Sequence, residues 1–148
     1  MSQTIYFTPH NHNDNICMPI IPKKAYPSDV GYDLTLIRHV KNINSVTDMY
    51  DSGISVTVPD GFYIEIVPRS SLSKFGYIMA NSIGIIDPSY TGTLRVVLTK
   101  VVPDADPISL PFARFQLIPR KLYSFVTEIS SEPQRKTIRG DGGFGSTD

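Results

Sequence analysis

The chain has 148 residues, and its 14 basic and 14 acidic side chains cancel to a formal net charge of zero. This length indicates a single domain that can bury a core of its own. A neutral chain lacks the basic surface of nucleic-acid-binding proteins, and no window approaches the roughly 18 consecutive apolar residues of a membrane-spanning helix. We therefore expect neither nucleic acid nor membrane as a partner.

The cysteine content bears on the compartment. Cys17 is the only cysteine, which excludes an internal disulfide bond and a zinc site built from several cysteines. We expect Cys17 to act as a small apolar residue in a reducing environment. The polar N-terminus does not resemble a signal peptide, so we expect a cytoplasmic or nuclear protein.

Twelve prolines and ten glycines divide the chain into short segments, and none carries a long apolar stripe at helical spacing. Residues 38–52 are polar, and we expect them to form a surface excursion between strands. In "ISVTVP", Ile54, Val56 and Val58 alternate with polar residues, and the following "GFYIEIVP" is β-branched and aromatic up to Pro68. Both patterns are typical of strands.

Alternation returns in the second half of the chain. In "TLRVVLTKV", Leu94, Val96 and Leu98 share one face. In "FARFQLIP", the apolar Phe115 and Leu117 lie opposite the polar residues. Short strands punctuated by turn residues predict an all-β sandwich or barrel.

One short helix is expected in "PRSSLSKFG". A serine can cap its start, Leu72 and Phe75 lie three residues apart, and Gly76 can end it. With Arg69 beside two serine hydroxyls, this helix start also suits an anion such as phosphate. The alternative, a capped helix with a surface arginine, explains the same residues without any ligand.

Two further segments each allow a structural and a functional interpretation. "GIIDPSYTG" places Asp87 directly after an apolar run and Tyr90 three residues on, and a proline turn with a half-buried ring explains both. "SDVGYDLT" contains Asp33 after a glycine turn, where a carboxylate can simply bond its own backbone. Taken alone, neither segment decides between a turn former and a site residue.

The last segment, "RGDGGFGSTD", is the one break in composition. Its four glycines allow backbone N–H groups to approach an anion closely, while Arg139 adds charge and Phe144 a flat apolar face. Because glycine-rich termini order poorly on their own, we predict a β domain over residues 1–136 and a flexible lid over residues 137–148. Such a lid can close over a phosphorylated aromatic ligand, and a nucleotide fits that description.

Five segments in chain order resemble the motifs of the trimeric dUTP pyrophosphatases, the dUTPase family: "SDVGYDLT", "PRSSLSKFG", "GIIDPSYTG", "FARFQLIP" and "RGDGGFGSTD". The resemblance implies a distorted jelly-roll (β-clip) subunit with one short helix, assembled as a homotrimer whose active sites are shared between protomers. It implies hydrolysis of dUTP to dUMP and pyrophosphate by in-line water attack on the α-phosphorus, with Mg²⁺ as cofactor. This reaction lowers dUTP and supplies dUMP for thymidylate synthesis.

The resemblance also assigns residues to the site, position by position. Asp87 would position the attacking water as the catalytic residue, Tyr90 would pack under the deoxyribose, and Asp33 would touch the water shell of the metal. The remaining residues would bind substrate: Arg69, Ser70, Ser71 and Gln116 at the phosphates, Asn81, Gly84 and Ile86 at the uracil, and Arg139, Phe144, Gly145, Ser146 and Thr147 in the lid.

The match departs from the family at a few positions. Ser71 stands where the family often has glycine. In the fourth segment Ala113 replaces the usual arginine, and Arg114 follows it, on the same strand face as the glutamine two residues on. Asp141 and Asp148 bring negative charge to the tail.

Three alternatives stay open. The related dCTP deaminases share "RSS" and an "IDP" turn, but they need a catalytic glutamate where this chain has Val97. A non-catalytic trimeric binding module on the same fold would keep the architecture without hydrolysis. A nucleic-acid-binding β-barrel would need a basic face interleaved with aromatic residues, which a neutral chain does not favour.

Overall fold

The computed structural model describes residues 3–146. Within that range it contains ten strands and one short 3-10 helix, and no α-helix. A small sheet pairs β1 (Tyr6–Pro9) with β5 (Ile54–Thr57). The prediction of an all-β chain with one short helix is confirmed. No helix in the described part is long and apolar enough to cross a membrane.

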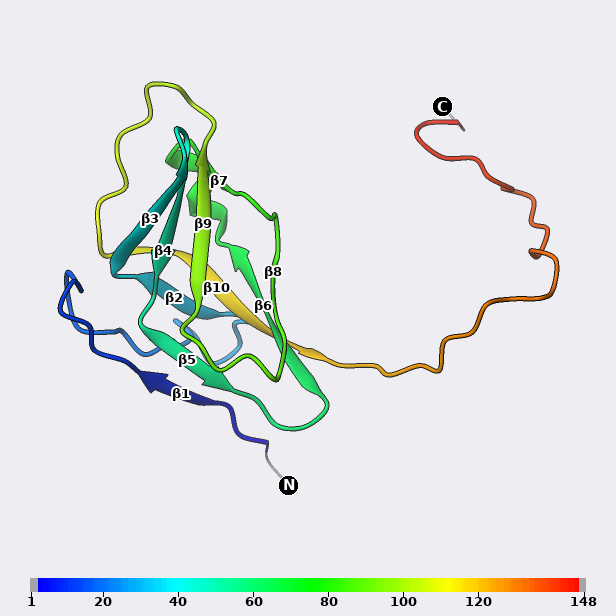
Figure 1. The fold of residues 1–148 in the computed structure, drawn as a ribbon, viewed down its shortest axis with the longest axis horizontal. Helices are drawn as coiled ribbons and strands as arrows, with labels where there is room; N and C mark the ends of the chain where they lie inside the picture. The colour runs from blue at the N-terminus through cyan, green and yellow to red at the C-terminus, as the bar shows by residue number, and fades with distance from the viewer. Residues whose placement is uncertain (1–2, 147–148) are drawn as a thin grey trace.

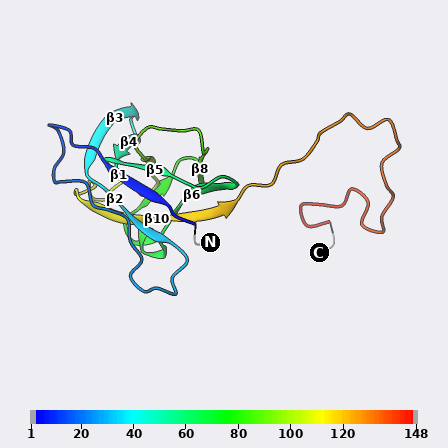
Figure 2. The same ribbon diagram turned by 90° about the horizontal axis from the view of Figure 1, so that it is seen from below.

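Two four-stranded antiparallel sheets make up the rest of the fold, and Figure 2 shows them as layers, with β3 and β4 on one side and β2 and β10 on the other. The first has the order β2 (Tyr32–Leu36), β10 (Phe112–Lys121), β6 (Phe62–Pro68), β8 (Gly84–Ile86). The second has the order β3 (Arg38–Asn44), β4 (Thr47–Asp51), β9 (Arg95–Lys100), β7 (Tyr77–Met79).

Apolar side chains from both sheets fill the space between the layers. Leu94, Val96 and Leu98, in and just before β9, are each at most 2% exposed, and Phe115 and Leu117 on β10 are fully buried. Burying one such side chain contributes roughly 1.5–3 kcal/mol. The alternation predicted for both strands is confirmed.

A bulge in β10 explains an apparent break in its pattern. Phe112 and Phe115 are both buried although an odd spacing of three places residues on opposite faces of a regular strand. Phe112 pairs with Leu36 and Phe115 with Leu34, so the ladder with β2 holds one extra residue on β10. The bulge lets two large rings enter the same core.

The predicted helix is present as the 3-10 helix η1 (Ser70–Lys74). The expected serine cap is wrong, because the capping position is Arg69, whose side chain makes no capping hydrogen bond. The Ser73 hydroxyl instead donates to the Ser70 carbonyl at 2.8 Å. Gly76 ends the helix as predicted, with φ of +77°.

The prediction that residues 38–52 form a surface excursion is wrong. They form the hairpin of β3 and β4, and β4 continues the second sheet by pairing with β9. Thr47, Tyr50 and Asp51 are buried. A polar segment can occupy the sheet because its polar groups pair there. The Thr47 and Thr99 hydroxyls, for example, lie 2.9 Å apart across the ladder.

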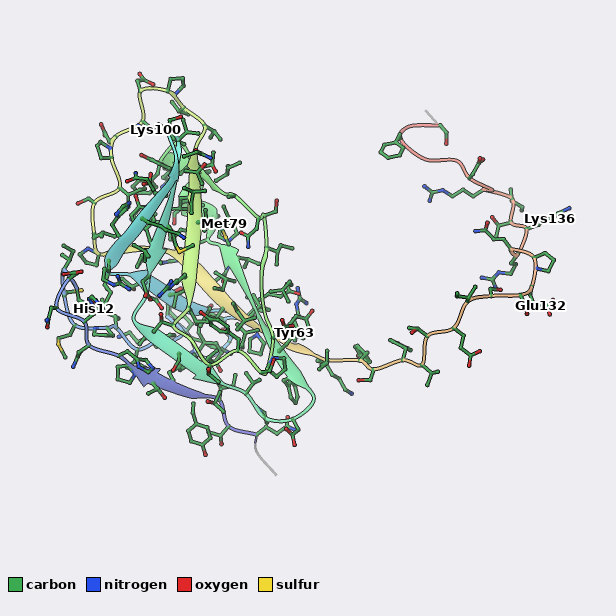
Figure 3. All side chains as sticks on the ribbon, in the orientation of Figure 1. His12, Tyr63, Met79, Lys100, Glu132 and Lys136 are labelled. Atoms are coloured by element: carbon green, nitrogen blue, oxygen red, sulfur yellow. The ribbon has the colours of Figure 1, made fainter. Side chains whose placement is uncertain are left out.

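The compact part of the chain ends with β10 at Lys121. Beyond it the chain runs away from both sheets, as Figure 1 shows. Its side chains, among them Glu132 and Lys136 in Figure 3, lie far from the β domain. Apolar residues are exposed along it, including Phe125, Val126 and Ile129. Large apolar side chains exposed in this way are typical of a segment that contacts a partner.

We predict that Gly76→Ala lowers the free energy of unfolding by about 2–4 kcal/mol, because a Cβ there would be strained at positive φ and would overlap the side chains of Val102 and Ala105. Gly61→Ala is the matched control, since Gly61 also has positive φ but open space around it. It should cost only about 1 kcal/mol. Urea denaturation compares the two, and equal losses would contradict the packing argument.

Candidate active site

Three of the residues assigned to the site meet on one sheet. β10 lies between β2 and β6, so Gln116 is paired with Asp33 on one side and with Val67 on the other. Arg69 follows the end of β6, and its Nε lies 3.5 Å from Asp33 Oδ1. Both side chains are about one-third exposed. The sheet therefore gathers a cation, a carboxylate and an amide at one accessible place.

The backbone holds this group in place. The Arg69 N–H donates to the Arg114 carbonyl at 2.8 Å, and Arg69 Nη1 donates to the Ala113 carbonyl at 3.2 Å. The Gln116 side chain lies over Gly31, where any Cβ would overlap Gln116 Oε1. Glycine at residue 31 thus creates the space that the amide occupies.

Ser70 and Ser71 begin η1 directly after this group. The Ser71 hydroxyl oxygen is buried, and it makes no hydrogen bond with any described residue. A buried hydroxyl without a partner costs free energy and calls for an explanation such as water or a ligand. A hollow of about 430 Å³ lies beside the helix start, lined by Arg69, Ser70, Met79 and Ser82 among others.

A larger cleft of about 850 Å³ is also lined by Arg69. Arg114 and Lys74 also line it, and the Arg114 guanidinium lies over the Phe75 ring, 5.0 Å from its centroid. Sequence reasoning did not find this cation–π pair, because nothing in the pattern links two residues so far apart. The bulge in β10 is what presents Arg114 to the ring.

A second group of assigned residues lies on the segment that links β7 to β9. Asn81 and Gly84 flank a tight turn in which Ser82 has φ of +62°. Asp87 and Tyr90 are the first and last residues of the next turn, where the Tyr90 N–H donates to the Asp87 carbonyl at 3.0 Å. Both side chains are exposed. Ile86 is half-buried at the end of β8.

Within one protomer the two groups do not meet around Asp87. In the β6–β8 ladder Ile86 lies opposite Ile64, so Asp87 is level with the start of β6. Arg69 follows the other end of that strand, after Pro68. Over roughly six residues at about 3.3 Å each, this separation is about 20 Å.

The assigned tail residues lie apart from both groups. Arg139 Nε donates to the Gly142 carbonyl at 2.8 Å, and the Ser146 N–H donates to the Gly143 carbonyl at 3.1 Å. Phe144 is fully exposed, and Gly145, like Phe144, has positive φ. All these hydrogen bonds are local to the tail. Thr147 lies outside the described residues.

Comparison with known proteins identifies the family. A family model described as dUTPase matches residues 19–148. The chain belongs to the dUTPase family. A deoxyuridine 5'-triphosphate nucleotidohydrolase of Corynebacterium jeikeium is 34% identical over 134 residues, which cover 86% of this chain and 84% of the relative.

Solved dUTPase structures share the fold. The dUTPase of Staphylococcus bacteriophage 80alpha with dUPNHPP has a TM-score of 0.75 at 17% identity and covers 98% of each chain. A mutant dUTPase from phage phi11 of S. aureus, in which a structural Mg(II) ion is coordinated, has a TM-score of 0.70 at 15% identity. It covers 87% of this chain and 97% of that one. The predicted family and jelly-roll fold class are confirmed.

We predict that Ser71→Ala raises the free energy of unfolding of this dUTPase-family chain by about 1 kcal/mol, because it removes a buried hydroxyl that has no partner. Ser52→Ala is the control. The Ser52 hydroxyl is also buried, but it donates to the Leu94 carbonyl at 2.8 Å and accepts from the Ile54 N–H at 3.1 Å. That variant should lose about 1–2 kcal/mol. Urea denaturation measures the free energy of unfolding of both variants. A lower value in Ser71→Ala than in the wild type would contradict the prediction.

Proposed function

We propose that this chain hydrolyses dUTP to dUMP and pyrophosphate by water attack on the α-phosphorus. Beside family membership, the observation that carries the proposal is the meeting of Asp33, Arg69 and Gln116 on one sheet, directly before the start of η1 at Ser70. A positive guanidinium with neutral donors suits phosphate oxygens. The reaction lowers dUTP and supplies dUMP for thymidylate synthesis, and we place it in the cytoplasm or nucleus.

We further propose that the active unit is a homotrimer with shared sites. Water attack at the α-phosphorus requires that the residues contacting the uracil, the sugar and the phosphates all lie within a few ångströms of one substrate molecule. In a single protomer Asp87 and Arg69 are about 20 Å apart along the strands. A second protomer would therefore supply Asp87 and Tyr90 to the Arg69 group. The exposed Ile85 on β8 supports a contact near that turn.

The roles follow from the chemistry of each side chain. Arg69, Ser70, Ser71 and Gln116 would hold phosphates, and Asp87 would act as general base or orient the water. Asn81 and the backbone of Gly84 and Ile86 would pair with the uracil edge. Since cytosine would leave those backbone groups unpaired, the site would reject dCTP.

Mg²⁺ is the proposed cofactor. Within residues 3–146 no group of three His, Cys, Asp or Glu side chains is arranged to hold a metal ion. We therefore propose that Mg²⁺ arrives bound to the triphosphate, since the ion prefers phosphate oxygens and its own waters to a protein cage. Asp33, half-buried beside Arg69, is the carboxylate that would contact the water shell. When bound, the ion would neutralise charge on the phosphates.

The experiment measures pyrophosphate release from each deoxynucleoside triphosphate with Mg²⁺, together with ammonia release from dCTP. We expect hydrolysis of dUTP alone. Equal rates on dCTP and dTTP would reject the specificity, ammonia release would indicate a deaminase, and a folded protein with no hydrolysis would indicate a binding module.

In the same assay Asp87→Asn should retain dUTP binding and lose about 100-fold or more in kcat, because general-base catalysis contributes roughly that much. Asp14→Asn, which changes an exposed acid in the N-terminal loop, is the control and should keep full activity. A wild-type kcat in Asp87→Asn would show that Asp87 is not the catalytic residue.

We propose that residues 137–148 form the lid of a neighbouring site, with Phe144 stacked on uracil and Arg139, Gly145, Ser146 and Thr147 on the phosphates. The local hydrogen bonds of the tail and the full exposure of Phe144 support this, since within residues 3–146 the Phe144 ring is not packed against the β domain. Residues 1–136 would be the β domain, whose last strand ends at Lys121 and is followed by an extended segment leading to the lid.

Deleting residues 137–148 should leave a folded oligomer with little catalysis, because the site would stay open to water. Size-exclusion chromatography and unfolding report the fold, and the pyrophosphate assay reports turnover. A truncated protein with wild-type kcat and KM would contradict the lid.

A further inference from the structure

Asp51, at the end of β4, is a buried carboxylate that the proposed reaction does not use. It is 3% exposed. Its Oδ2 accepts from Arg38 Nη2 at 2.7 Å and from the Thr93 hydroxyl at 2.9 Å, and Arg95 Nε lies 3.4 Å away. Its Oδ1 accepts from the Gly53 N–H at 2.8 Å. Two cations and two neutral donors therefore fix this side chain.

Thr93 connects the carboxylate to the turn of the candidate site. Its hydroxyl donates to Asp51, and its carbonyl accepts a hydrogen bond from the Tyr90 hydroxyl at 2.8 Å. The Tyr90 N–H in turn donates to the Asp87 carbonyl. Thr93 thus bonds the Asp51 carboxylate through its side chain and the Tyr90 hydroxyl through its backbone carbonyl.

The surrounding backbone leaves this connection little freedom. The Ser52 N–H and hydroxyl both donate to the Leu94 carbonyl, at 3.0 and 2.8 Å, and the Leu94 N–H donates to the Ile54 carbonyl at 2.7 Å. The Tyr90 ring lies against Gly92, where a Cβ would come within 2.6 Å of Tyr90 Cζ. The ring is therefore confined by the backbone beside it and by its bond to Thr93.

We propose that Asp51 is a positioning residue that sets the tilt of the Tyr90 ring through Thr93, and thereby the discrimination between deoxyribonucleotides and ribonucleotides. The inference rests on the proposed function, in which Tyr90 packs under the deoxyribose and leaves no room for a 2′-hydroxyl. Asp51 itself touches no substrate. Its effect reaches the sugar only by way of the Thr93 carbonyl.

Thr93→Val tests the connection without removing the buried charge. The substitution keeps the shape of the side chain, and Asp51 retains Arg38, Arg95 and Gly53. We expect the ratio of kcat/KM for dUTP to that for UTP to fall about three- to tenfold, the equivalent of one lost hydrogen bond. The kcat for dUTP should stay near wild type, because Asp87 is unchanged.

Two further variants separate positioning from stability. Thr93→Ser keeps the hydroxyl and should restore the wild-type ratio. Thr99→Val removes a half-buried threonine hydroxyl on β9 that bonds Thr47 and not Asp51. It should lower stability and leave the ratio unchanged.

The outcomes distinguish the inference from the proposed function. The inference is overturned if Thr93→Val keeps the wild-type ratio of kcat/KM for dUTP to that for UTP, or if Thr99→Val lowers that ratio as much. In either case the proposed function stands. A wild-type protein that does not hydrolyse dUTP rejects both. Affinities for non-hydrolysable dUTP and UTP analogues, measured by calorimetry, should show the same loss of preference in Thr93→Val.

Discussion

The position of β10 between β2 and β6 is the constraint on which the candidate site depends. Each residue of a central strand is paired on both sides, so its register is set twice. Here the double pairing aligns Gln116 with Asp33 on one neighbour and with Val67, two residues before Arg69, on the other. A slip of one residue would turn Gln116 to the opposite face and replace it with a buried apolar side chain. Since burial of Phe115 and Leu117 opposes that slip, the core and the site are specified by the same ladder.

The second sheet shows how a polar segment can be structural. Asp51 is buried with Arg38 and near Arg95, and its cost of desolvation is offset only because its oxygens have cationic and neutral donors together. It ties β3, β4 and the start of β9 to one point, directly behind the turn that carries Asp87 and Tyr90.

The residues assigned to the proposed reaction lie in two groups, the Asp87 turn at one end of β6 and the Arg69 group at the other. In the Arg69 group, which we propose to bind the phosphates, the arginine is fixed by two backbone carbonyls. The Asp87 turn is exposed, and its Tyr90 hydroxyl is held by the Thr93 carbonyl. Neither end by itself carries all the residues assigned to the proposed hydrolysis, and beyond Lys121 the described part of the tail leaves Phe125, Val126 and Ile129 exposed. These features support the proposal that the protomer acts as part of a homotrimer.

The sequence by itself determined the family, the all-β class, the alternation of β9 and β10 and the place of the short helix, because each of these depends on neighbouring residues and on local period. It did not predict the β3–β4 hairpin, in which Asp51 is buried where Arg38 and Arg95, distant from each other in the chain, come together. It did not predict the stacking of Arg114 on Phe75, which needs the bulge in β10. It named Arg69, Asp87 and Gln116, but only the pairing of strands decided which of them meet. That pairing is a property of the whole folded chain, since register is set by the burial of many residues at once and cannot be read from any one segment.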